Sequence, residues 1–209
     1  MVFLRLFKNN RAGGIAVVIL LALGLFVQTF IARNEIPVNP GMSLYNLIFK
    51  PLQDIPVLNA LTSLAILLFT GYILNRIGLR FSLLEDRSFM PAIFFLLFAA
   101  TLPESRHLSP ALIGSPFYLI CFGLIFDAHD DQPDTFRIFH AGIFLAIGSL
   151  FYIKLIWFLP VIWISVGTLR PATFREMIYP VTALVTAGLL LFAWHWGIRD
   201  DSGRFVELM

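Results

Sequence analysis

The sequence predicts an all-α fold, a polytopic bundle of about seven transmembrane helices in one integral membrane domain over residues 1–209. Of the 209 residues, 58% are hydrophobic and 13% are charged, whereas a soluble domain has about 45–50% apolar and about 25% charged residues. The apolar residues also form long uncharged runs that alternate with short polar turns. A soluble core of this size cannot cover so much apolar surface, so we expect lipid to surround most of the chain.

The first uncharged run, residues 12–32, follows three basic residues and is 21 residues long. That exceeds the core of about 7–15 residues that is typical of a signal peptide, so we expect a retained first helix. At 1.5 Å per residue it reaches about 30 Å, the thickness of the hydrocarbon layer. The stretch 42–52 mixes apolar and polar residues after a proline-rich segment. It fits either an amphipathic helix lying in the membrane interface or an ordinary loop.

Three further crossings are expected over residues 55–75, 88–103 and 108–126, each bounded by polar turns. The crossing 88–103 has only sixteen residues, so it needs local thinning, shelter by neighbours or snorkelling flanks. Arg87 and Arg106 are placed to snorkel. Prolines inside the run 108–126 are tolerable where neighbouring groups satisfy the freed carbonyls.

The run 138–169 is 32 residues long and is interrupted only by Lys154. As one helix it would span about 48 Å, which is too long for an untilted crossing. We therefore expect two short helices, 138–153 and 155–169, that form a tight hairpin. One long tilted helix is the alternative. The last crossing is expected over 177–198.

The distribution of Lys and Arg predicts an orientation in the bilayer. With the N-terminus in the cytoplasm, nine basic residues flank the crossings inside and six outside. This favours a cytoplasmic N-terminus and a periplasmic C-terminus in a bacterial inner membrane. If 138–169 is a single helix, the side of the C-terminus reverses.

Composition also excludes some functions. No basic patch is interleaved with aromatic residues, so we expect no nucleic-acid partner. The single cysteine, Cys121, excludes an internal disulfide and a multi-cysteine metal site, and it fits a small core residue. No motif predicts a cofactor.

One acidic cluster contains side chains that can ligate metals: Asp127, His129, Asp130 and Asp131. Carboxylates and imidazole at close spacing can hold a divalent cation. However, the glycine and the distal glutamate of a calcium loop are missing. We favour the alternative, a solvated loop that ends a helix in water.

Ionisable residues near or within the crossings are the remaining binding candidates. They are Arg87, Glu104, Arg106, His140, Lys154, Arg170 and Arg175. Glu104, His140 and Lys154 could line the path of a small transporter. Lys154 can equally reach the headgroups from a turn, and Glu104 can simply mark a helix end.

Glu35 and Asp54 lie in the first outer loop. Polytopic glycosyltransferases that act on lipid-linked sugars place an acidic residue just beyond their first helix, where it serves as a base toward the acceptor. An enzyme of this type, using Glu35 or Asp54 with Glu104 and a metal as additional participants, is therefore one alternative. Because the crossings are almost purely apolar, we instead expect a non-catalytic subunit of a cell-envelope complex, with lipid and other membrane subunits as partners.

Two blocks of the chain resemble a family of polytopic inner-membrane proteins of Bacteroidota that is known as a domain of unknown function. The first block carries Arg87, Ser88, Phe89, Pro91 and Ala92, then Pro103 and Glu104, then Leu108, Ser109 and Pro110. The second carries Phe151, Tyr152, Leu169, Arg170, Pro171, Arg175 and Glu176. The resemblance implies an inner-membrane location and a multi-pass topology, and it implies no activity. Members of that family are longer, so we expect this chain to lack their last portion.

Overall fold

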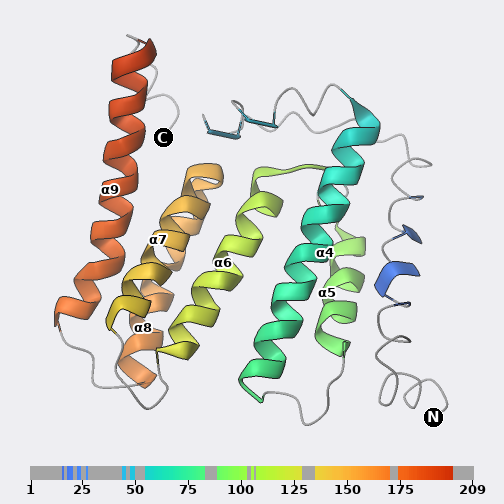
Figure 1. The fold of residues 1–209 in the computed structure, drawn as a ribbon, viewed down its shortest axis with the longest axis horizontal. Coiled ribbons are helices and arrows are strands. Elements are labelled where there is room, and N and C mark those ends of the chain that lie inside the picture. Colours follow the sequence, from blue (N-terminus) through green and yellow to red (C-terminus); the bar gives the residue numbers. More distant parts are fainter. Residues whose placement is uncertain are drawn as a thin grey trace. The chain divides into compact units, whose positions relative to one another are not determined.

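The computed structural model describes residues 55–82, 89–102, 105, 107–128, 135–169 and 174–199, and eleven scattered positions between 16 and 49. In these residues the chain forms helices and turns and no strand, which confirms the all-α prediction (Figure 1). The helices are α4 (Pro56–Arg80), α5 (Met90–Thr101), α6 (Pro110–Asp127), α7 (Thr135–Phe151), the 3-10 helix η2 (Ile153–Phe158), α8 (Leu159–Leu169) and α9 (Phe174–Arg199). Most of the predicted segments 12–32 and 42–52 lies outside the described residues.

Three of the described helices are long and apolar enough to cross a membrane. These spans are Pro56–Arg80, Pro110–Asp127 and Phe174–Ala193. The 25 residues of α4 extend over about 37 Å, more than the hydrocarbon thickness of about 30 Å. The twelve residues of α5 cover only about 18 Å. The structure is thus consistent with a membrane location.

Proline marks the start of three helices. Pro56 begins α4 after an extended Ile55, and Pro91 is the second residue of α5. Pro110 begins α6, and the Ser109 hydroxyl accepts a hydrogen bond from the Leu112 N–H at 3.2 Å. Proline suits the first helical turn because its missing N–H would have no partner there. Ser109 supplies the N-cap that satisfies one of the other free N–H groups.

The chain divides into two compact units. The first contains residues 1–39 and 49–112, and in its described part α4 packs against α5 (Figure 1). Leu67, Leu96, Ala99 and Leu112 form its buried apolar cluster. Because twelve residues cannot span a bilayer alone, α5 depends on this contact with the longer α4.

The second unit contains residues 40–48 and 113–209 and is organised around α7. Its core residues are Cys121, Ile125, Ala128, Ile138, Ala141, Leu145, Leu155, Ile162 and Val166. The backbones of α7 and α9 approach closely at Gly142, where a Cβ atom would lie 2.6 Å from the Cα of Pro180. Aromatic pairs join α6 to the end of α7 and to η2, with ring centroids 5.8 Å apart in Phe117–Phe151 and 4.2 Å apart in Tyr118–Phe158.

The long apolar run around Lys154 is divided. Helix α7 ends at Phe151, Tyr152 is extended with φ −142° and ψ 97°, and η2 leads into α8. Leu155 anchors this break because it is buried where α6 and α7 carry glycines. A Cβ at Gly114 would lie 2.7 Å from the Leu155 Cδ1, and a Cβ at Gly148 would lie 3.0 Å from the same atom. The sequence alone allowed either one helix or two over residues 138–169. The structure divides this run into α7 and, after η2, α8.

Candidate functional site

The most distinctive polar feature of the described chain is the buried face of α4. Asn59, Ser63, Thr70 and Asn75 lie on it, each at most 5% exposed, together with two buried glycines, Gly71 and Gly78. Asn59, Ser63 and Thr70 are four and seven residues apart and share one stripe of the helix. Gly71, Asn75 and Gly78 are four and three residues apart and share a neighbouring stripe. Small and polar residues allow helices to approach closely and to form hydrogen bonds in lipid. This face therefore suits close packing against a neighbouring helix.

The hydroxyl groups on this face bond to their own helix. The Ser63 hydroxyl donates to the Ala60 carbonyl at 2.8 Å, and the Thr70 hydroxyl donates to the Ile66 carbonyl at 2.7 Å. Such bonds to residues three or four earlier remove the need for a partner from another helix.

The two asparagines cannot be satisfied in this way. The Asn59 Oδ1 accepts a hydrogen bond from the Leu108 N–H at 2.8 Å. Among the described residues, the Asn59 Nδ2 and the Asn75 Oδ1 have no partner. A buried polar atom without a partner costs about 1–3 kcal/mol, and of these two residues Asn75 also lines a pocket.

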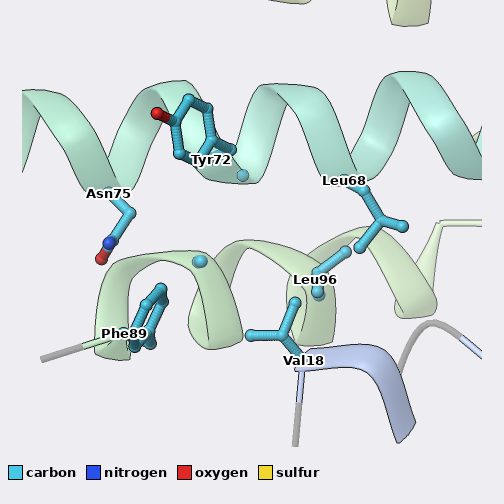
Figure 2. A pocket seen from close by; sticks show the side chains of 8 residues that line it. Val18, Leu68, Tyr72, Asn75, Phe89 and Leu96 are labelled. Atoms are coloured by element: carbon cyan, nitrogen blue, oxygen red, sulfur yellow. The ribbon is translucent and has the colours of Figure 1, made fainter. Parts of the chain in front are cut away.

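A pocket of about 160 Å³ lies beside Asn75, between α4 and α5. Figure 2 shows Asn75 and Phe89 at one end of this α4–α5 pocket, and Leu68, Leu96 and Val18 toward the other. Gly71, Tyr72 and Ala92 complete its walls. The lining is mostly apolar, and the Asn75 side chain adds an amide to it. Such a pocket takes an apolar molecule and orients it by a few polar contacts.

Gly71 of α4 faces α5 at the pocket. A Cβ atom at Gly71 would lie 3.7 Å from the Ala92 Cβ and 3.7 Å from the Phe95 Cδ1. These are ordinary contact distances, so a methyl group fits there without displacing a neighbour.

A buried carboxylate, Glu176, lies in the first turn of α9 and is 6% exposed. Next to it in sequence, the Met177 carbonyl accepts a hydrogen bond from the Trp163 Nε1 at 2.9 Å, which links α8 to α9. A carboxylate at a helix N-terminus is stabilised by the helix dipole. We therefore read this place as the junction of two helices rather than as a reaction centre. Arg175 beside it is exposed.

His140 and Lys154 do not meet. Both side chains are exposed on the described chain. The His140 Nδ1 lies 2.8 Å from the carbonyl oxygen of Phe136, one turn earlier in α7. Lys154 lies beyond the other end of α7, with its Nζ 6.0 Å from the centroid of the Tyr152 ring. From His140 to the end of α7 is about 16 Å along the axis, so these two residues do not line one common site.

Asp127 is half-buried at the end of α6. Its backbone carbonyl accepts a hydrogen bond from the Arg137 guanidinium at 2.6 Å, a contact that ties the end of α6 to the first turns of α7. Among the residues that the structure describes, no group of three His, Cys, Asp or Glu side chains could hold a metal ion. The other candidates lie outside those residues: Glu35, Asp54, Arg87, Glu104, Arg106, His129, Asp130, Asp131 and Arg170.

Comparison of the chain with protein-family models, with curated proteins and with solved structures finds no match. The resemblance to the Bacteroidota membrane family therefore stays a prediction, and function has to be argued from the residues.

Sequence reasoning missed Asn59, Asn75 and the α4–α5 pocket. Neutral amides do not interrupt an uncharged run, so a search for charged residues passes over them. A signal was present, because polar or small residues recur at 59, 63, 71, 75 and 78 in an otherwise apolar helix and this helical spacing marks a packed face.

Proposed function

We propose that this protein is a multi-pass protein of the bacterial inner membrane and a non-catalytic subunit of a cell-envelope complex. The observation that carries the proposal is the exposed apolar surface of α9. Of its span Phe174–Ala193, 17% is buried within the chain, against 39% for the spans in α4 and α6. A helix that is apolar all round and so little covered needs lipid or another protein around it.

The buried residues of α9 lie on one face of its first half. Glu176, Pro180 and Ala183 are buried at spacings of four and three residues, and α9 packs on α7. Val185, Leu189 and Phe192 are exposed on the opposite face. We assign these three residues as the surface that contacts a partner membrane helix, with lipid covering the rest.

Site-specific photo-crosslinking tests the subunit role. A photoreactive amino acid at Leu189 or Phe192 should give crosslinks to another membrane protein, whereas the same residue at the buried Ala183 should give none. The partner should also co-purify with the wild-type chain in mild detergent. A clean monomer that crosslinks only to lipid would contradict the subunit role.

Fractionation and topology reporters test the location separately. The chain should stay with inner-membrane vesicles after an alkaline wash, and a reporter fused to the N-terminus should be active only in the cytoplasm. A C-terminal reporter is expected to be active in the periplasm. Recovery of the protein in the aqueous fraction without detergent would refute the membrane assignment.

A further inference from the structure

The polar end of the α4–α5 pocket holds a hydrogen-bond acceptor for which the described part of the chain supplies no donor. Asn75 is 5% exposed, lines the pocket, and its Oδ1 has no hydrogen-bond partner among the described residues. In Figure 2 its side chain extends from α4 toward the start of α5, beside Phe89. An amide oxygen in this position accepts an O–H or N–H donor. A ligand that brings such a donor removes the cost of leaving the oxygen unpaired.

The size of the pocket restricts the group that can fill it. An apolar cavity of about 150 Å³ holds a molecule the size of benzene, and this pocket measures about 160 Å³. From Asn75 to Leu68 it extends over seven residues of α4, which is about 10 Å. A short segment of an alkyl chain fits these dimensions, with its polar end at Asn75 and its aliphatic part between Leu68 and Leu96.

The position of Asn75 along α4 indicates where the donor lies in a bilayer. Asn75 is the last residue of the uncharged run, and the next residue, Arg76, is exposed. Arg76 and the exposed Tyr72 are one turn apart on the same side of α4, and tyrosine and arginine are typical of the membrane interface. The polar end of the pocket therefore lies at the boundary between headgroups and acyl chains.

We infer that the α4–α5 pocket binds the chain of a membrane lipid that carries a hydroxyl or amide N–H next to that chain, and that this donor bonds to Asn75. Water alone would pair with the oxygen but would leave the apolar walls unfilled. The inference requires α4 to cross the membrane but is independent of the subunit role, because the pocket belongs to α4 and α5 and not to α9.

Lipid binding to the purified full chain can be measured by native mass spectrometry in detergent. The first probe pair is a diacylglycerol and its methyl ether, which differ in one hydroxyl donor. The second pair is a fatty-acid N-methyl amide and the methyl ester of the same acid, which differ in one N–H. We expect the donor in at least one pair to lower the Kd about fivefold, and the responding pair identifies the donor. Equal Kd values within both pairs would overturn the inference in favour of water or a protein side chain.

Variants test whether the lipid occupies this pocket. Asn75→Leu should abolish the preference for the donor-bearing probe. Leu68→Trp should fill the pocket and raise the Kd of the preferred probe about tenfold, as expected for displacing about two methylene groups. The matched control is Leu61→Trp, at an exposed position of the same helix, which should bind as the wild type does. Equal binding by the Leu68 and Leu61 variants would overturn the inference.

Gly71→Ala provides a second variant that the fold accommodates, because its methyl group meets Ala92 and Phe95 at 3.7 Å. The added methyl group narrows the pocket. The Kd of the preferred probe should therefore rise about threefold, which is the effect of about one methylene group. If Leu68→Trp does not fold, Gly71→Ala tests whether the lipid occupies the pocket. An unchanged Kd of the preferred probe for this variant would refute the inference.

Discussion

The Asn59 Oδ1 accepts a hydrogen bond from the backbone N–H of Leu108 at 2.8 Å, between two buried residues 49 positions apart. Leu108 comes just before Ser109 and Pro110, the cap and first residue of α6. The bond therefore fixes the entry into α6 against the first turn of α4. In an apolar environment each backbone N–H needs a hydrogen-bond partner, and Asn59 supplies one to Leu108.

Asn59→Leu should lower the free energy of unfolding by about 1–2 kcal/mol, because it removes the hydrogen bond between the buried Leu108 N–H and the Asn59 side chain. Denaturant titration in detergent micelles measures this change. Leu61→Ala, at an exposed position of the same helix, serves as the control and should change the free energy by less than about 0.5 kcal/mol. Equal stability of wild type and Asn59→Leu would show that the hydrogen bond contributes nothing.

Ser109→Ala should destabilise the protein by about 1 kcal/mol, because it removes the N-cap of α6. Ser109→Thr retains the hydroxyl and should recover most of the loss. Circular dichroism during thermal unfolding in micelles reports the midpoint for both variants. If the alanine and threonine variants melt together, the hydroxyl is not acting as a cap.

Gly142→Ala should destabilise the second unit by about 1–3 kcal/mol, because the added Cβ would lie 2.6 Å from the Pro180 Cα, a backbone atom that cannot move aside alone. Gly188→Ala is the matched control on α9, where nothing lies within 4 Å of the added atom. It should be neutral or stabilising by up to about 1 kcal/mol. Denaturant titration of both variants tests the contact, and similar effects of the two substitutions would argue against a close approach of α7 and α9.

Trp163→Phe should lower the free energy of unfolding by about 0.5–1.5 kcal/mol, because it keeps an aromatic ring but loses the bond from the Trp163 Nε1 to the Met177 carbonyl. Trp157→Phe is the control, since Trp157 is 81% exposed. Thermal unfolding in micelles measures the melting temperature of both variants. An equal shift in both variants would mean that the hydrogen bond between α8 and α9 has no net effect.

Uncharged runs locate the helices but not their ends. The run 55–75 lies within α4, which continues through Arg76 to Arg80. Arginine is a good helix former, so it marks the edge of the apolar layer without stopping the backbone. Likewise α9 begins at Phe174, three residues before the apolar run 177–198.

Candidate site residues were harder to predict than helices. The sequence drew attention to His140 and Lys154 because charged groups are rare in apolar runs. Both are exposed, His140 in the second turn of α7 and Lys154 three residues beyond its end. Asn59 and Asn75 are buried, and their importance depends on which neighbours they contact. Leu108 is 49 residues from Asn59, and no local pattern indicates that pairing.

The sequence by itself determined that this protein is helical and rich in apolar spans, because hydropathy and helix length are local properties that each run carries alone. Only the tertiary structure decided that the run around Lys154 divides, that Gly142 meets Pro180, and that Asn75 faces a pocket. Each of these depends on contacts between helices that are distant in the chain. In closely packed helices one Cβ atom or one unpaired amide decides what can lie beside it.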